Sequence, residues 1–209
     1  ANANDAKQFE QLKHFPTQPL KGQVTSVYST SLLSTKTILC GEGYLCPPID
    51  GWHNFGATYN LDDKDEKTTF TANLQNMASI QKWLPSWLPE ETDASKLVTE
   101  NMLTANAGLR CTTPDYMPIV GHAPNYNEML KHFSPLRKDA KSCEDLYGKY
   151  YPNLFINIGH GSKGSVTTPI AAELISALVT GSPKPFNTEQ STVIAPARFI
   201  IRHLKQGKI

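Results

Sequence analysis

The stretch from Asn153 to Gly181, NLFINIGHGSKGSVTTPIAAELISALVTG, restricts the possible folds more than any other part of the chain. It starts with the apolar, partly β-branched run Leu154–Ile158, which is typical of a buried strand. Three glycines then lie within residues 159–164, the glycine bend, where the backbone can approach a neighbour closely. Thr168 as N-cap and Pro169 as first helical residue predict a helix that ends at Gly181. The stretch therefore predicts a strand, a bend and a helix in succession.

The glycine bend matches the pattern GxGxxG, but its context argues against a dinucleotide-binding fingerprint. That fingerprint opens a βαβ unit with a second strand and an acidic residue about 20 positions further on. Here a proline-containing loop follows Gly181 instead. The bend still offers backbone N–H groups and a positive helix end to an acceptor. A tight connection without a ligand is the alternative, and His160 could act as an acid or base or only bond the backbone.

Composition excludes several classes of protein. The 209 residues carry a formal net charge of +1, so any nucleic-acid surface must be local. No apolar run approaches the roughly 18 residues of a membrane span, and the first ten residues lack the features of a signal peptide. The cysteines show no CxxC pair, which predicts reduced thiols in the cytosol, a cytoplasmic protein and no metal site. These cysteines are Cys40, Cys46, Cys111 and Cys143.

The rest of the pattern predicts an α+β fold with a mainly antiparallel sheet and flanking helices. The predicted strands are a first one entered through Gly22, a short one at 37–39, a hairpin of 43–46 with 52–59, and two more at 107–113 and 117–121. The predicted helices cover 68–83 and 196–205, and residues 182–190 read as a loop. A stripe at helical spacing in the first helix predicts core contacts. Its members are Phe70, Leu74, Met77, Ile80 and Leu84.

Two side chains outside the glycine bend are candidates for ligand contacts. Arg110 lies in an otherwise small or apolar run, where a guanidinium is costly unless it is paired. Its fork suits a carboxylate or phosphate, and an internal salt bridge, for example to Asp115, is the alternative. Tyr44 in the hairpin could present its hydroxyl to a ligand or be a packed amphipathic residue.

Three motifs occur in a fixed order: GxYLxPxxxGxxxxGATY, then GLRxTTPDxxPIVG, then a strand, GHGSKG and a helix. This order resembles the superfamily of D-amino-acid, glycine and sarcosine oxidases. The chain also contains LKGQV at 20–24 and PARFIIR at 196–202. With these segments and the three motifs, it is similar to a narrower family along nearly its whole length. It is the family of the FAD-dependent oxidoreductase half of the bifunctional tRNA 5-methylaminomethyl-2-thiouridine biosynthesis protein.

The resemblance also implies boundaries. The family's half begins with a Rossmann unit that this sequence does not contain, so the chain resembles a C-terminal fragment, with residues 1–5 as the last strand of the FAD domain. Residues 1–19 would end that domain and link it to a substrate-binding domain at 20–151. Residues 152–209 would return to the FAD domain as a strand, loop and helix. The two ends of the chain are therefore expected to lie close together.

The resemblance implies an activity and a site. The parent enzyme would remove the carboxymethyl group from 5-carboxymethylaminomethyl(-2-thio)uridine at the tRNA wobble position. Arg110 would clamp the substrate carboxylate, and Tyr44 would bound the same pocket. The glycine bend would lie against the flavin, with Ser162 where related oxidases often have a larger polar residue and Lys163 as a possible cation. The expected FAD-contacting residues are Gly159, His160, Gly161, Ser162, Lys163 and Gly164.

The resemblance further implies tRNA as a partner and a methyltransferase half in the parent chain. Arg198, Arg202 and Lys205 are the expected phosphate contacts, with an ordinary solvated helix end as the alternative. This chain alone is expected to retain little FAD, because the main phosphate-binding loop is missing. Apolar surface on the 153–181 helix predicts a possible homodimer. Two alternatives are a fragment of a small-molecule glycine or sarcosine oxidase, and a non-catalytic module that binds tRNA.

Overall fold

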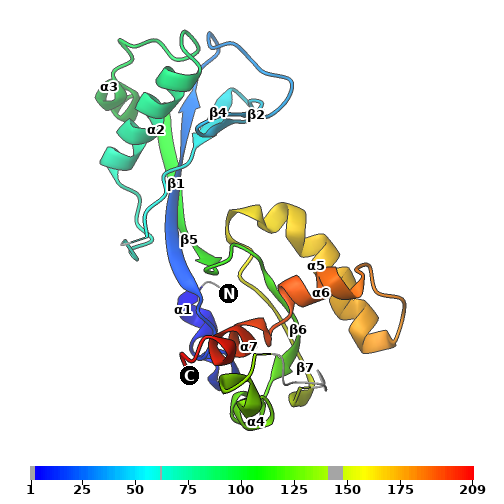
Figure 1. Cartoon of the computed structure of the whole chain (residues 1–209). Helices are drawn as coiled ribbons and strands as arrows, with labels where there is room; N and C mark the ends of the chain where they lie inside the picture. The colour runs from blue at the N-terminus through cyan, green and yellow to red at the C-terminus, as the bar shows by residue number, and fades with distance from the viewer. Residues whose placement is uncertain (1–2, 62, 141–147) are drawn as a thin grey trace. The chain divides into compact units, whose positions relative to one another are not determined.

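The computed structural model describes residues 3–61, 63–140 and 148–209, and it divides into two units (Figure 1). Unit 2 is the continuous segment 20–109, and unit 1 combines residues 1–19 with 110–209. The first boundary falls where the substrate-binding domain was predicted to start. The second boundary between the units lies at 109–110, because the segment after Arg110 packs with the C-terminal helices, and the predicted domain boundary at 151–152 stays a prediction. Whether unit 2 binds substrate stays a prediction.

Unit 2 is built on a sheet with the strand order β2-β3-β4-β1-β5. The predicted hairpin is present: β3 pairs antiparallel with β4, with Tyr44 opposite Gly56. A side chain on Gly43, just before β3, would come within 2.6 Å of the Gly56 carbonyl oxygen, so this crossing requires glycine. The strands are β1 (Gln18–Tyr28), β2 (Leu39–Cys40), β3 (Tyr44–Leu45), β4 (Trp52–Gly56) and β5 (Leu103–Thr112).

Helix α2 (Phe70–Trp83) covers this sheet, capped by the Thr69 side chain, and α3 (Ala94–Thr99) follows it. The predicted core stripe is only partly correct, since Met77 and Ile80 are buried but Phe70 and Leu74 are exposed. The helix instead turns polar residues toward β1. Its apolar contacts form one core with the strands and α3. The buried members are Val27, Leu45, Phe55, Met77, Ile80, Trp87, Leu88 and Ala94.

Unit 1 contains a two-stranded antiparallel sheet of β6 and β7, with Gly121 opposite Ile156. Short helices pack around it, and Figure 1 shows α4 beside α7. Phe15 and Phe199 share one buried cluster, so the N-terminal segment and α7 lie together as expected. The strands are β6 (Ile119–Pro124) and β7 (Tyr150–Ile158). The α-helices are α1 (Ala3–Ala6), α4 (Tyr126–His132), α5 (Gly164–Thr180), α6 (Thr188–Ile194) and α7 (Arg198–Lys205). The 3-10 turns are η1 (Glu10–Leu12), η2 (Ser134–Arg137) and η3 (Gly161–Lys163).

Three local predictions are wrong. Residues 3–6 form a helical turn and not a strand, while residues 1–2 lie outside the described part. The predicted loop at 182–190 contains the start of α6, which Asn187 and Gln190 stabilise by a capping box. The long helix begins at Gly164, so Pro169 lies inside α5 and Thr168 is not its N-cap. Gly181 does end α5, with a left-handed φ of 73°.

Candidate functional site

The glycine bend packs against the end of β5. Gly159 is buried with a φ of +78°, and a Cβ there would lie 2.8 Å from Thr113 Cγ2. Gly161 has a φ of +56°, and a Cβ added there would lie 3.5 Å from Thr112 Cγ2, an ordinary contact distance. Residues 112–113 follow Arg110 directly, so the structure places the second and third sequence motifs in contact within unit 1.

Alanine at position 159 is therefore expected to lower the free energy of unfolding by about 2–4 kcal/mol. The left-handed backbone accounts for about 1–2 kcal/mol and the clash with Thr113 for the rest. Gly181→Ala is the matched control, since its φ is +73° and no described atom lies within 4 Å of the added methyl group. Chemical denaturation of both variants makes the comparison. If both variants lose the same free energy of unfolding, Thr113 does not restrict the side chain at position 159.

The start of α5 leaves its backbone N–H groups available. Lys163 occupies the N-cap position, and no side chain of the described residues caps this end. Gly164 continues directly from the 3-10 turn of 161–163. Ser162 and Lys163 are exposed on that turn. Uncapped amides at the positive end of a 17-residue helix can stabilise an acceptor or a partial negative charge.

His160 fixes the bend to both neighbouring elements. Its Nδ1 lies 2.7 Å from Thr167 Oγ1 in α5, and its Nε2 lies 2.7 Å from the Asn157 side-chain amide at the end of β7. Thr167 Oγ1 donates its own proton to the Lys163 carbonyl, so it accepts from Nδ1–H. In a neutral ring Nε2 then carries no proton and accepts one from Asn157, whose amide must be turned to present its NH₂ group. Both ring nitrogens are thus engaged within the protein. The geometry favours a positioning role for His160 over a free acid or base, and Asn157 is a partner that sequence reasoning missed.

Burial lowers the pKa of His160 below its ordinary value of about 6.5. The folded protein keeps this imidazole neutral, so its contribution to the free energy of unfolding is complete above the ordinary pKa of about 6.5. This contribution is lost as the pH falls through the lowered pKa of the folded state, because the buried ring must then take up a proton. We expect the unfolding free energy of the wild type to drop between pH 7.5 and 5, and less so in His160→Gln. Denaturation at several pH values measures this. The same pH slope in both proteins would contradict it.

Arg110 is half-buried near the end of β5. Side chains alternate along a strand, so Arg110 shares a face with Thr112, whose Cγ2 would meet a Cβ added at Gly161. The guanidinium has no hydrogen-bond or ion-pair partner within residues 3–61, 63–140 and 148–209. The alternative of a salt bridge to Asp115 is wrong, because that carboxylate binds other arginines.

Asp115 is the centre of an ion-pair cluster that sequence reasoning missed. Arg198 approaches it through two nitrogens at 3.0 Å each, and Arg202 Nη2 lies 3.1 Å away. Arg198 also donates to the Met117 carbonyl at 2.8 Å. Burial alone would raise the pKa of Asp115, but the hydrogen bonds and charge of Arg198, with Met117 and Arg202, hold it below the ordinary value. The cluster ties the turn after β5 to α7.

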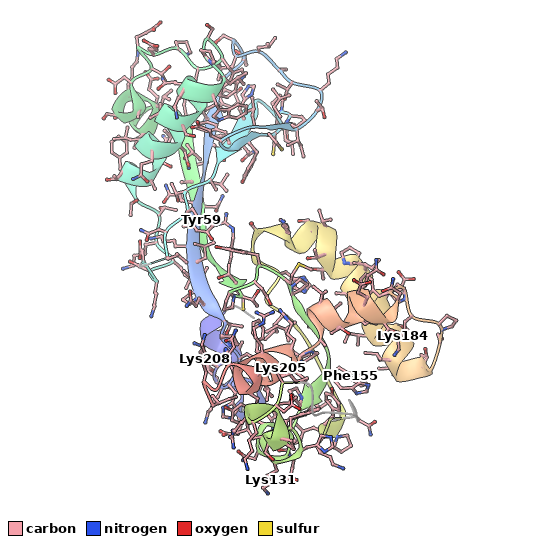
Figure 2. All side chains as sticks on the ribbon, in the orientation of Figure 1. Tyr59, Lys131, Phe155, Lys184, Lys205 and Lys208 are labelled. Atoms are coloured by element: carbon pink, nitrogen blue, oxygen red, sulfur yellow. The ribbon has the colours of Figure 1, made fainter. Side chains whose placement is uncertain are left out.

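This cluster changes the expected tRNA contacts. The Arg198 side chain is only 6% exposed and is saturated by protein partners, so the structure contradicts its prediction as a phosphate contact. Arg202 is half-exposed and Lys205 is exposed. Figure 2 shows Lys205 and Lys208 on the C-terminal segment. The two candidates that remain accessible are Arg202 and Lys205.

Tyr44 belongs to unit 2, where it pairs with Cys40 and Gly56 across the sheet. It is partly buried, and its place in a pocket with Arg110 stays a prediction. In the described part of the chain, no group of histidine, cysteine or acidic residues could hold a metal ion. Cys40, Cys46 and Cys111 are free thiols, and Cys143 lies outside the described residues.

The residues around the glycine bend fit part of a flavin site. Gly159 and Gly161 leave the bend without side chains, and the amides of α5 open beside it without a cap. By contrast, the bend is not followed by a βαβ unit, since α5 leads to α6 and the neighbouring strands β6 and β7 are antiparallel. The bend therefore suits contact with a ring rather than with a dinucleotide pyrophosphate.

Curated relatives match this chain along its length. The tRNA 5-methylaminomethyl-2-thiouridine biosynthesis bifunctional proteins of Chromobacterium violaceum and of a Marinomonas species are 31% and 34% identical to it. The matches cover 100% and 99% of this chain but only 31% and 32% of those proteins. The chain thus spans about a third of the length of the curated relatives it matches.

Solved structures show the same fold. Glycine oxidase from Geobacillus kaustophilus has a TM-score of 0.61 at 17% identity, covering 88% of this chain and 40% of that protein. Iminodiacetate oxidase from a Chelativorans species has a TM-score of 0.56 at 18% identity, with 85% and 40% covered. The α+β prediction is confirmed. The family described as FAD dependent oxidoreductase matches residues 1–178, and this chain therefore belongs to it.

Proposed function

We propose that this chain is the substrate-binding and C-terminal part of an FAD-dependent enzyme that modifies tRNA. The enzyme would remove the carboxymethyl group from 5-carboxymethylaminomethyl(-2-thio)uridine at the wobble position. The observation that carries the proposal is the Arg110 guanidinium, which is unpaired among the described residues and shares a strand face with Thr112 against the glycine bend. The names of the curated relatives support tRNA as the substrate.

Arg110 supplies the group that a substrate with an N–CH₂–COO⁻ unit needs. Its fork can hold the carboxylate through two parallel N–H donors, which fixes the adjacent carbon in position. When bound, the flavin would accept the hydride that leaves this carbon, and hydrolysis of the resulting substrate imine would release glyoxylate and the aminomethyl base. Tyr44 would bound the pocket as a further substrate contact.

The glycine bend would hold the flavin ring in place. Backbone N–H groups at the start of α5 would stabilise negative charge on the ring, and the exposed Lys163 could add a cation. His160 would act by keeping the bend rigid through Asn157 and Thr167. Ser162 would add only a small hydroxyl, and Gly164 has no side chain. The phosphates of FAD would bind elsewhere, so this chain alone should retain little FAD.

The tRNA would bind through a local basic surface that includes Arg202 and Lys205. Each phosphate contact would add to a salt-dependent affinity. A methyltransferase half in the same full-length protein and action in the cytoplasm belong to the same proposal. Separately, no helix in the described ranges is both long and apolar enough to cross a membrane. A homodimer through exposed apolar residues of α5, such as Val166 and Val179, also stays a prediction.

The test uses a full-length enzyme, of the length of the curated relatives, that contains this sequence. It is incubated in separate reactions with tRNA carrying the carboxymethylaminomethyl base, with free glycine and with sarcosine, and glyoxylate release is measured in each. We expect glyoxylate from the tRNA at a much higher kcat/KM. Preferential oxidation of glycine or sarcosine would favour a small-molecule oxidase instead, and no oxidation of any of them would leave a binding module.

A further inference from the structure

Unit 2 contains a cavity of about 410 Å³ between α2 and the segment that follows β4. This volume lies in the range of small-molecule sites. Every residue that lines it belongs to unit 2, and neither Arg110 nor a residue of the glycine bend is among them. Most of its lining is polar, and the residues that matter for the argument are Lys21, Tyr59, Asp63, Asn76 and Ser79.

The orientation of the Asn76 amide is fixed by a buried polar network. Its Nδ2 lies 2.9 Å from the Gln23 carbonyl oxygen and 3.0 Å from Thr25 Oγ1. The carbonyl can only accept, and Thr25 already donates its proton to Asn73 Oδ1 at 2.8 Å. Asn76 must therefore present its NH₂ group to β1.

The other end of this amide is an acceptor without a protein partner. Asn76 is only 3% exposed and lines the cavity, and its Oδ1 has no hydrogen-bond partner among the residues that the structure describes. It is not one of the fully buried unpaired atoms of the described residues, so the cavity leaves this oxygen accessible. A ligand in the cavity that donates a hydrogen bond would satisfy it.

Lys21 provides donors on the same lining. It is 4% exposed, and its Nζ lies 2.7 Å from Asp63 Oδ2. The hydrogen bond from Lys21 is the largest cause that lowers the pKa of Asp63, so Asp63 is a carboxylate at neutral pH. An ammonium has three donors, and this ion pair uses one. The remaining N–H groups can bind an acceptor on a ligand.

The charges of the cavity argue against an anion. Lys21 is neutralised by Asp63, and the other carboxylate on the lining, Glu42, pairs with Lys82 at 2.8 Å. A phosphate or carboxylate would find no unpaired positive charge among the described residues that line this pocket. The ligand should be neutral and should carry a donor and an acceptor close together.

Tyr59 adds a flat surface to this polar lining. The residue is 58% exposed and lines the cavity, and Figure 2 shows it on the segment after β4. Unpaired bases in RNA stack on such rings and form hydrogen bonds through their edges. Every base edge combines donors with acceptors, which matches Asn76 Oδ1 and Lys21 Nζ.

We propose that this cavity binds an unpaired nucleobase of the tRNA, stacked on Tyr59 and bonded to Asn76 and Lys21. The inference rests on the proposed tRNA substrate and adds a second contact beside the modified base. With such a site, the affinity for RNA depends on whether an unpaired base is available for stacking, and not only on the charge of the phosphates.

The test measures binding of a fluorescently labelled anticodon stem-loop to the 209-residue chain by anisotropy. Tyr59→Ala should raise Kd by about 5- to 150-fold, as for one stacked base, and Tyr59→Phe should bind like the wild type. Ser79→Leu fills the cavity from α2 without touching the Asn76 network and should also weaken binding. Leu61→Ala is the control, because this exposed side chain is outside the cavity lining.

Wild-type binding that is unchanged by both Tyr59→Ala and Ser79→Leu would overturn the inference, as would equal competition by a fully paired RNA duplex. A wild type that does not bind the stem-loop would overturn it too. Failure of the proposed function is distinguishable. If the stem-loop binds in the cavity but the full-length enzyme releases no glyoxylate from the modified tRNA, only the oxidase activity is rejected. If Tyr59→Ala in the full-length enzyme releases glyoxylate with a normal KM for the tRNA, only the base site is rejected.

Discussion

Arg110→Ala is expected to lower kcat/KM for the modified tRNA by about 30- to 5,000-fold in the full-length enzyme. The carboxylate would lose its charged partner, and truncation of one member of a desolvated charge pair costs about 2–5 kcal/mol. Stability should hardly change, because Arg110 has no ion pair within the described residues to lose. Glyoxylate release measures the activity, and thermal unfolding measures the stability.

Arg110→Lys separates charge from geometry, since lysine keeps the charge but lacks the bidentate fork. It should recover only part of the activity. Arg137→Ala is the matched control, because this exposed arginine donates from Nε to the Ile209 carbonyl and lies outside the candidate site. Wild-type kcat/KM in Arg110→Ala would exclude the carboxylate clamp and leave only a shared scaffold.

Asp115→Ala is expected to lower the free energy of unfolding by about 3–5 kcal/mol. The substitution leaves the buried Arg198 guanidinium without its carboxylate, and an uncompensated buried charge has a cost of this size. It also frees the turn after β5 from α7, because Arg202 loses the same partner. Chemical denaturation at neutral pH measures the loss.

Glu128→Ala is the control for Asp115→Ala. It breaks the exposed ion pair with Lys131, which should change stability by less than about 1 kcal/mol. The lowered pKa of Asp115 adds a pH dependence. Its contribution is complete above the ordinary carboxyl pKa of about 3.9 and is lost as pH falls through the lowered value. Similar losses in the two variants would show that Arg198 finds another partner.

Local chemistry explains what could be predicted from the sequence. The hairpin of β3 and β4 follows from its turn residues, and α2 follows from apolar residues at helical spacing. Gly181 ends α5 as expected, because only a left-handed residue completes that turn easily. The capping-box residues Asn187 and Gln190 indicate the start of α6 in the sequence, but the surrounding prolines made the segment resemble a loop.

Contacts between distant residues explain what could not be predicted. Asp115 and Arg198 are 83 positions apart, so the sequence does not reveal that this arginine is internal rather than a phosphate contact. Hydrogen bonds from Gln23 and Thr25 of β1 determine which face of α2 packs on the sheet. As a result Asn73 and Asn76 are buried against β1, and Leu74 is exposed. Propensity and spacing carry no information about such partners.

The candidate site was predictable in its parts but not in its supports. The glycine bend and Arg110 were identified from motifs, and the bend packs against residues 112–113, while a shared pocket with Arg110 stays a prediction. The engagement of both His160 nitrogens was not predictable, because it depends on how β7 and α5 meet. Functional assays must test the roles assigned to these residues.

The division of unit 1 into residues 1–19 and 110–209 affects how the protein is synthesised. Phe15 leaves the ribosome long before Phe199, its partner in the buried cluster, has been made. The inserted unit 2 is continuous, so it can fold meanwhile, and its neighbouring strands β1 and β5 then hold the two segments together. During translation Phe15 therefore lacks this contact until Phe199 has been made.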